Sequence, residues 1–256
     1  MTPPGVTTER LDGGVLVIAI DRPAVRNAVD AATARQLADA FDELDADDDL
    51  RAGVLTGKGG DFSTGMDLAA ATRGERPIVP GRGFGGLTQE PPRTPLVAAV
   101  EGYALAGGFE MVLACDLIVA SRTAQFGLPE VRRGLIAGAG GLLRLPERIP
   151  YHAAMALVLT GDRMDAATAE RHGLLTQLVD EGGALDAAVA LARRIAANAP
   201  LAVRTSKRIL AGLGRPTPAQ LHAEQEPLLR EVFDSADAQE GILAFTQKRP
   251  PRWQGR

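Results

Sequence analysis

The sequence predicts an α/β fold with a helical C-terminal region. Apolar runs that are typical of buried strands, residues 15–20, 52–56 and 96–100, alternate with segments of helical spacing in the first half of the chain. Beyond Pro150 the pattern becomes almost wholly helical. Because 256 residues can bury a sizeable core, we expect one large α/β unit followed by helices.

The N-terminal half is expected to begin with a hairpin, because strands 6–10 and 15–20 flank a turn of aspartate and glycine. Asp30 can then cap a helix whose apolar residues, such as Leu37 and Phe41, recur at helical spacing. That helix should end in the acidic residues 45–49. The remaining expected elements of this half are the strand 52–56, the loop 57–65, a stretch rich in glycine and proline at 73–92, and the strand 96–100.

The second half is expected to contain a short helix before its final helical region. Thr217 and Gln220 fit a capping box, and Pro218 fits the first helical position. Pro227 implies a kink, and Pro250 should stop the last helix. The expected elements are a helix 107–114, strands 117–120 and 125–127, a glycine-rich segment 134–141, and helices 142–148, 184–198, 201–210, from 217 onward, and 236–248.

Composition excludes several classes of function. The net charge of −4 provides no basic field, so neither a nucleic acid nor a membrane surface is expected as a partner. The lone Cys115 excludes an internal disulfide, and the histidines lie too far apart for a zinc site, so no metal is expected. The apolar stretch 102–120 carries Glu110 and Asp116, which favours a buried core segment over a membrane span. Residues 1–10 lack a secretory pattern, so we expect a cytoplasmic protein.

Glu110 is the first candidate catalytic residue, because an ionised carboxylate is costly in so apolar a stretch unless it is paired or needed. Gly107 and Gly108 precede it at an expected helix start, where free amides can hold a negative oxygen. An equally good interpretation is that the glycines allow tight packing and Glu110 is a satisfied first-turn carboxylate. Asp116, at a helix-to-strand junction, is expected to be structural.

Glu130 is the second candidate carboxylate. It follows Pro129 where a strand is expected to end, a position that can aim a side chain into a cleft, although a lone charged loop residue is more often solvated. Two carboxylates in one site could divide acid and base roles. The loop 61–68 also presents backbone amides, chiefly that of Met66, whereas Ser63 lacks the glycine spacing and histidine partner of a nucleophile.

A nucleotide-binding interpretation is disfavoured. The glycines at 81, 83 and 86 match the spacing G-x-G-x-x-G, but no strand precedes them and no helix follows. Residues 65–68, 102–110 and 126–130 instead resemble, in this order, motifs of the enoyl-CoA hydratase (crotonase) family. The resemblance covers almost the whole chain, from Arg22-Pro23 and Asn27-Ala28 through 138–141 to 237–241 and Lys248-Arg249.

The resemblance implies a ClpP/crotonase-type spiral of β-β-α turns for residues 1–199, which would hold the active site. It also implies that residues 200–256, beyond a boundary near Pro200, form a helical oligomerisation region that builds a homotrimer, often paired as a hexamer. The substrate it implies is an acyl-CoA thioester, so that coenzyme A is part of the substrate and no separate cofactor is expected.

By motif position, the amides of Met66 and Gly107 resemble the two oxyanion-hole donors, and Glu110 and Glu130 resemble the paired catalytic carboxylates. The resemblance thus implies an enoyl-CoA hydratase, a hydro-lyase of fatty-acid and acyl-CoA metabolism that reversibly adds water to a 2,3-unsaturated thioester. Coenzyme A binding would fall on Arg26, Asn27 and Ala28, with Lys248 contributed by a neighbouring subunit. An ordinary surface cation is the alternative for Arg26.

Other functions on the same fold stay open. Residues 65–68 and 83–88 are similar to the carnitinyl-CoA dehydratase branch of the family. An enoyl-CoA isomerase would need only one essential carboxylate, and both Glu110 and Glu130 are present. A non-catalytic acyl-CoA-binding protein is a third alternative, since a fold does not determine a function.

Overall fold

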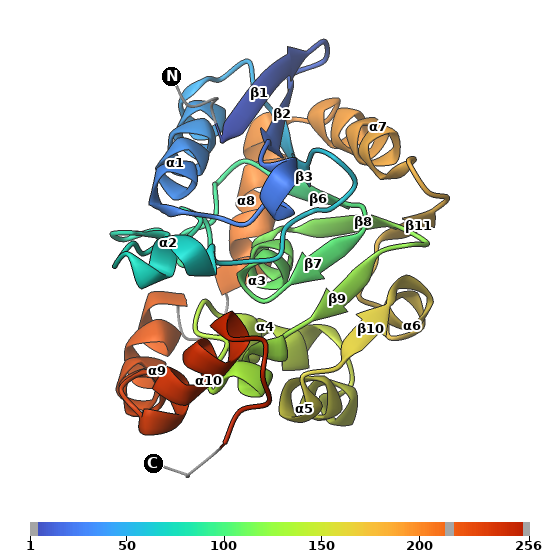
Figure 1. Cartoon of the computed structure of the whole chain (residues 1–256). Helices are drawn as coiled ribbons and strands as arrows, with labels where there is room; N and C mark the ends of the chain where they lie inside the picture. Colours follow the sequence, from blue (N-terminus) through green and yellow to red (C-terminus); the bar gives the residue numbers. More distant parts are fainter. Residues whose placement is uncertain (1–4, 213–217, 253–256) are drawn as a thin grey trace.

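The computed structural model describes residues 5–212 and 218–252, and it contains the expected mixture of strands and helices (Figure 1). A six-stranded sheet has the order β1-β2-β3-β6-β8-β11, and a three-stranded sheet has the order β10-β9-β7. The strands are β1 Val6–Leu11, β2 Val15–Ile20, β3 Ala52–Gly57, β4 Ile78–Val79, β5 Gly83–Phe84, β6 Leu96–Val100, β7 Tyr103–Leu105, β8 Leu117–Ser121, β9 Gln125–Gly127, β10 Arg163–Asp165 and β11 Gln177–Val179.

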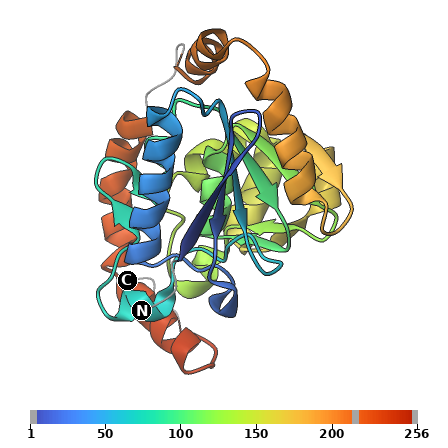
Figure 2. The ribbon, with the colours of Figure 1, turned by 90° about the horizontal axis from the view of Figure 1, so that it is seen from above.

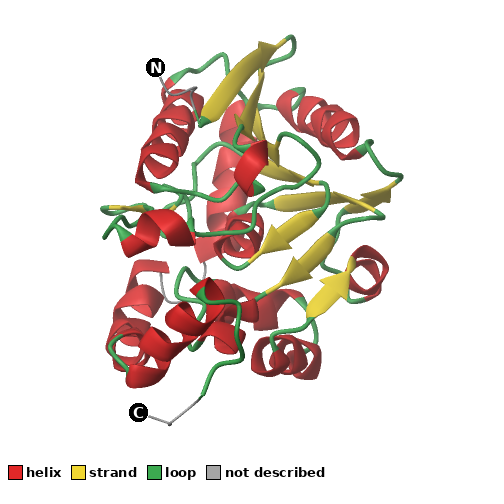
Figure 3. Ribbon diagram, viewed as in Figure 1, coloured by secondary structure: helices red, strands yellow, loops and turns green. Residues whose placement is uncertain are grey.

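Helices enclose the large sheet on both sides. Figure 2 shows α1 and α7 on opposite sides of the strands, and only helices follow β11 in the described chain (Figure 3). The helices are η1 Pro23–Val25, α1 Ala31–Ala46, α2 Leu68–Thr72, α3 Gly107–Ala114, η2 Pro129–Arg133, α4 Gly141–Arg148, α5 Tyr151–Thr160, α6 Ala166–Arg171, α7 Ala184–Ala196, α8 Pro200–Gly212, α9 Pro218–Phe233 and α10 Ala236–Thr246.

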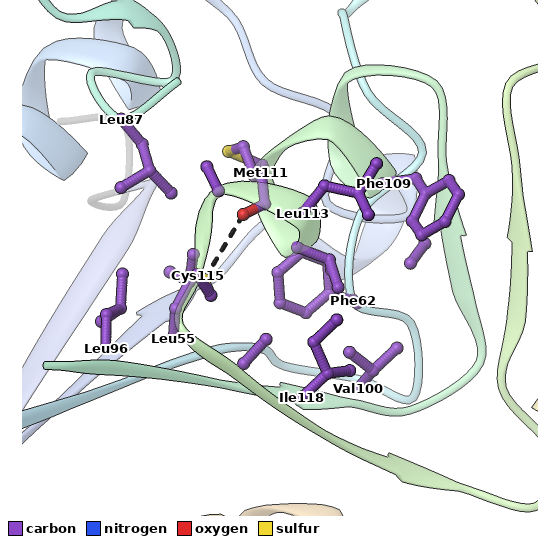
Figure 4. Packing of buried hydrophobic residues seen from close by; sticks show 14 of the residues in the cluster. Leu55, Phe62, Leu87, Leu96, Val100, Phe109, Met111, Leu113, Cys115 and Ile118 are labelled. Atoms are coloured by element: carbon purple, nitrogen blue, oxygen red, sulfur yellow. Dashed lines mark hydrogen bonds between the residues drawn. The ribbon is translucent and has the colours of Figure 1, made fainter. Parts of the chain in front are cut away.

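The large sheet is buried on both faces, as its mostly parallel strands require. Successive residues of β2 illustrate this: Leu16 and Ile18 enter the core shared with α1 and α3, whereas Val15 and Val17 pack towards α7. Figure 4 shows part of the first core, where residues of α3 pack against those of the neighbouring strands. This core surrounds α3 and thereby fixes the helix that carries Glu110.

The expected N-terminal elements are confirmed. Strands β1 and β2 pair antiparallel, with Val6 opposite Ile20 and Leu11 opposite Val15. Asp30 caps α1, because its carboxylate accepts a hydrogen bond of 2.8 Å from the Thr33 amide. The glycine-rich segment that mimics a nucleotide fingerprint belongs instead to the small β4-β5 hairpin.

The expectation of an almost wholly helical chain beyond Pro150 is wrong. Strand β10 pairs antiparallel with β9, and β11 adds to the edge of the large sheet beside β8. Strands of three residues are too short to show an alternating pattern, and their hydrogen bonds go to segments that are distant in the sequence. The last helix ends at Thr246, because Lys248 has a left-handed backbone with φ 52°. Pro227 lies inside α9, and the capping residue Thr217 lies outside the described residues.

Asp116 has the expected structural role. Its Oδ2 accepts hydrogen bonds from the Leu96 amide at 2.8 Å and from the Lys207 ammonium at 2.5 Å. Lys207 also donates to the carbonyl of Thr94 at 3.2 Å. One carboxylate therefore ties α8 to the start of β6. Within the described residues, no helix combines the length and apolar character needed to cross a bilayer.

We expect Asp116→Ala to lower the free energy of unfolding by about 2 kcal/mol, because it removes the acceptor of the Leu96 amide and the negative charge that pairs with the partly buried Lys207 ammonium. Asp180→Ala is the matched control, since Asp180 pairs with Arg122 on the exposed surface. That change should cost less than about 0.5 kcal/mol. Urea unfolding of the two variants measures the difference, and equal losses would contradict the role assigned to Asp116.

Candidate active site

Glu110 is held inside the core by backbone amides. Only 3% of the residue is exposed, and its Oε1 accepts hydrogen bonds from Ala139 at 2.7 Å and Gly141 at 2.8 Å. Gly140 makes this cradle possible with a left-handed φ of 96°. A side chain at Gly141 would meet the Cγ of Glu110 at 2.9 Å. The glycine-rich turn before α4 is therefore built around this carboxylate.

Glu130 reaches the same place from η2, which begins at Pro129 directly after β9 and Leu128. Glu130 as a whole is partly exposed, but its Oε2 is buried and has no hydrogen-bond partner among the described residues. An unpartnered buried carboxylate oxygen is costly unless a ligand or water completes it. Oε2 of Glu130 is thus free to accept a hydrogen bond near the Glu110 carboxylate.

The pKa values of both carboxyls are raised, chiefly because burial disfavours their charged forms. The negative charge of Glu110 raises the pKa of Glu130 further, which places the two groups close together. For Glu110, the amides of Gly141 and Ala139 and the charge of Arg144 partly oppose the rise. Two neighbouring carboxyls repel each other when both are ionised, so the state in which one keeps its proton is favoured. In that state the site offers an acid and a base together.

Two backbone amides, one of them in the first turn of the helix that carries Glu110, have no acceptor among the described residues. Gly107 opens α3, and a side chain at Gly65 would lie 2.8 Å from the Gly107 nitrogen, so the loop before Met66 touches the start of α3. Neither the Met66 nor the Gly107 amide donates a hydrogen bond to any described acceptor. Gly107 itself has no room for a side chain, because the ring of Phe84 would lie 2.5 Å away. The pair can therefore donate to one negative oxygen.

The backbone around these amides is strained in one place. Ala106 precedes α3 with φ 52° and ψ −130°, a backbone conformation that residues other than glycine rarely adopt. Ser63 is fully buried, donates to the Asn27 carbonyl and accepts from the Gly65 amide. Ser63 is therefore a structural residue of this loop, as its sequence context indicates.

The expected coenzyme A loop lies on η1 and the residues that follow it. Arg26 is exposed. Its Cζ lies 5.2 Å from the centre of the Tyr103 ring, and its Nε lies 3.9 Å from Oδ2 of Asp61. Asn27 is fully buried, and its side chain bonds to the Arg22 amide and to the carbonyls of Lys58 and Asp61. The Asn27 side chain thus shapes the loop rather than facing solvent.

Ala28 and Lys248 differ in exposure. Ala28 is buried, and its carbonyl accepts a hydrogen bond from the Arg22 guanidinium. Lys248 is exposed just after α10 and forms no hydrogen bond or ion pair with residues 26–28 within the described chain. The structure of one chain therefore places Glu110 near Glu130 and the loop before Met66 against the start of α3, but it leaves Lys248 apart from the loop at residues 26–28.

Arg144 is a site residue that the sequence pattern does not reveal. It lies on α4, donates to the Thr88 carbonyl at 2.6 Å, and its charge lowers the pKa of Glu110 in part. Burial lowers the pKa of Arg144 itself. An arginine one turn into a helix is ordinary in sequence, so only its proximity to Glu110 gives it significance. Among the described residues, no group of His, Cys, Asp and Glu is arranged to hold a metal ion.

Comparison with known proteins places this site in a family. The family description enoyl-CoA hydratase/isomerase matches residues 10–256. The chain is 55% identical to an enoyl-CoA hydratase of Mycobacterium tuberculosis H37Rv, whose crystal structure superposes with a TM-score of 0.81 over 99% of this chain and 100% of that chain. It is 44% identical to a carnitinyl-CoA hydratase of Mycobacterium avium, with a TM-score of 0.94 and full coverage of both chains.

A curated relative is similar over nearly its whole length. The carnitinyl-CoA dehydratase of Proteus mirabilis strain HI4320 is 41% identical over 256 residues, which cover 95% of this chain and 96% of the relative. The family match and these identities extend over nearly the whole sequence, and the solved structures share its mixed α/β architecture and C-terminal helices. The chain therefore belongs to the enoyl-CoA hydratase/isomerase family and has the crotonase fold.

Proposed function

We propose that the protein is an enoyl-CoA hydratase, a hydro-lyase that reversibly adds water to the 2,3-double bond of an acyl-CoA thioester. The observation that carries the proposal is the pairing of two buried carboxyls of raised pKa, Glu110 and Glu130, beside two uncommitted backbone amides. Water addition to a conjugated thioester needs these groups, because an acid, a base and an oxyanion site must act together.

The amides of Met66 and Gly107 would bind the thioester oxygen. As water adds to C3, negative charge moves onto this oxygen, and preorganised donors stabilise it more in the transition state than in the substrate. The loss of one such donor typically costs about 3 kcal/mol. The missing side chain at Gly107 lets the ring of Phe84 pack against the start of α3, and the missing side chain at Gly65 lets its loop approach the Gly107 nitrogen.

The two carboxyls would divide the proton transfers. Two backbone hydrogen bonds favour the ionised form of Glu110, and the charge of Glu110 favours the protonated form of Glu130. Glu110 then accepts a proton from water as the water oxygen bonds to C3. Glu130 delivers its proton to C2 as the electron pair returns from the thioester oxygen, so atoms and charges balance. Dehydration is the reverse sequence.

The coenzyme A part of the substrate would bind along residues 26–28. Arg26 is exposed and can reach a phosphate, whereas Asn27 and Ala28 would contribute through the backbone that they shape. We propose that Lys248 adds a second cation from a neighbouring subunit, in a trimer or a hexamer built by residues 200–256. Exposed apolar side chains in this region, including Leu201, Leu210 and Phe245, support that assembly.

A carnitinyl-CoA dehydratase is the second candidate. Proteins with carnitinyl-CoA names are 41–44% identical to this chain over nearly its full length. The same carboxyls and amides could remove water from a hydroxyacyl thioester, so the two candidates differ in the acyl group and not in the machinery. Turnover of crotonyl-CoA compared with carnitinyl-CoA separates them.

We expect Glu110→Gln and Glu130→Gln each to lower kcat for the hydration of crotonyl-CoA by about 10²- to 10⁴-fold, because each removes one proton-transfer group. The loss of the conjugated enoyl-thioester absorbance measures the rate. Glu181→Gln, which changes an exposed glutamate, is the control. Full hydration by Glu130→Gln together with none by Glu110→Gln would contradict the paired-carboxylate mechanism and favour an isomerase.

The pH dependence follows from the raised pKa values. Below the lower step of the pair both carboxyls are protonated and no base remains, whereas above the higher step both are ionised and no acid remains. We expect a bell-shaped plot of kcat/KM whose acid limb lies above the ordinary range of a glutamate, because both pKa values are raised. Glu110→Gln removes the charge that raises the pKa of Glu130, so the alkaline limb of its residual activity should move to lower pH. An unmoved limb would argue against the coupling.

We expect Arg26→Ala to raise KM for an acyl-CoA by about tenfold, equivalent to about 1.4 kcal/mol, with a smaller change in kcat. The reason is that Arg26 would contact coenzyme A and not the reacting carbons. Arg122→Ala, which changes an exposed arginine paired with Asp180, is the matched control. Steady-state kinetics with crotonyl-CoA provide the measurement, and an unchanged KM would remove Arg26 from the binding site.

A further inference from the structure

We propose that Arg22 is a positioning residue of the oxyanion hole, because its guanidinium fixes the peptide groups on both sides of the Met66 amide. The inference rests on the proposed role of Met66 and adds a residue that does not touch the thioester. Arg22 lies just before η1, 44 positions before Met66 in the sequence. Its effect depends on a set of hydrogen bonds that joins three segments of the chain.

The Arg22 guanidinium binds two carboxylates and one carbonyl. Its Nη2 lies 3.0 Å from Oδ2 of Asp30 and 3.0 Å from Oδ2 of Asp67, and its Nη1 donates to the carbonyl of Ala28. The Arg22 side chain is only 22% exposed. Its backbone is anchored as well, because Asn27 accepts from the Arg22 amide and donates to the Arg22 carbonyl.

Both carboxylates also cap helices. Oδ1 of Asp30 accepts from the Thr33 amide at 2.8 Å, at the start of α1, and Oδ1 of Asp67 accepts from the Ala70 amide at 3.1 Å, at the start of α2. Each aspartate therefore uses one oxygen for a helix and the other for Arg22. A single planar fork ties the first turns of two helices together.

The Met66 amide lies between these anchored points. The Val29 amide donates to the Gly65 carbonyl at 2.8 Å, and the Asp67 amide donates to the Val29 carbonyl at 2.9 Å. Val29 thereby holds the peptide groups before and after Met66. The neighbours of Val29 in the chain, Ala28 and Asp30, both bind Arg22, as does Asp67. Arg22 thus holds the residues on both sides of Val29 and the residue after Met66, while the Met66 amide stays free to donate.

This arrangement predicts that replacing Arg22 lowers the reaction rate and does not only remove an ion pair. An oxyanion donor works only if it is aimed before the reaction, and a displacement of about 1 Å can cost about 10²-fold in rate. We expect Arg22→Met to lower kcat for crotonyl-CoA hydration by about 10- to 100-fold. Arg22→Lys should restore part of the rate, because an ammonium can satisfy one carboxylate but not the planar fork.

Arg10→Met is the matched control. Arg10 also bridges two carboxylates, those of Glu43 on α1 and Asp47 directly after it, but its side chain is exposed and contacts nothing near Met66. Its loss should leave kcat unchanged. Asp67→Asn keeps a capping group but removes the charge that Arg22 binds, and it should reproduce part of the Arg22→Met effect without adding to it in the double variant.

A spectroscopic readout separates positioning from mere stabilisation. Hexadienoyl-CoA absorbs at longer wavelength when donors polarise its thioester carbonyl, and a Glu130→Gln background should slow the addition of water by about 10²- to 10⁴-fold. We expect Arg22→Met in that background to lose most of this shift while still binding the ligand, and Arg10→Met to keep it. A folded Arg22→Met protein with the full shift and the original kcat would overturn the inference and leave Arg22 a structural residue.

Hydrogen exchange tests the positioning without any substrate. Amides in the segment that contains Met66 and Asp67 should exchange faster in Arg22→Met than in wild type, and at the original rate in Arg10→Met. Unchanged exchange would overturn the inference even if the wild type hydrates no enoyl-CoA. An inactive wild type with faster exchange in Arg22→Met would instead refute the proposed function and retain the clamp on the Met66 loop.

Discussion

The burial of the Glu110 carboxylate is the constraint on which the active site depends. A charge in the core between α3 and α4 is tolerable only with compensating donors, and the structure supplies the amides of Ala139 and Gly141. Those donors can approach only because Gly141 lacks a side chain and Gly140 adopts a left-handed backbone. One carboxylate therefore determines the turn before α4 and the distance between two helices.

The proposed oxyanion hole likewise depends on glycines that let distant parts of the backbone come close together. The loop before Met66 touches the start of α3 because Gly65 lacks a side chain, while hydrogen bonds to Ser63 and Val29 hold this loop in place. Strand β3 precedes the loop, and β6, followed by β7, precedes α3; β3 and β6 are parallel and are fixed by burial on both faces. The rigid sheet thus delivers two loops to one point, and hydrogen bonds within the loops aim the amides.

How far the sequence predicts this arrangement depends on the range of the interactions. Strand β6 and helix α3 carry their own apolar patterns, so both were predictable from local residues. The strands β10 and β11 were not, because three residues carry no periodicity and their pairing partners β9 and β8 are remote. Glu110 was recognisable as a charge in an apolar run, whereas the significance of Arg144 depends on a fold that brings α4 against α3.

Two unfavourable features of the described residues lie where the chemistry is proposed. Ala106 has an unfavourable backbone, and Glu130 keeps a buried oxygen without a partner, although each could be relieved by a glycine or a neutral side chain. Elsewhere, Asp116 and Asn27 have their polar groups satisfied. A fold under selection for stability alone would have little reason to keep either feature. The cost is understandable if a substrate oxygen and a water molecule complete these groups during turnover.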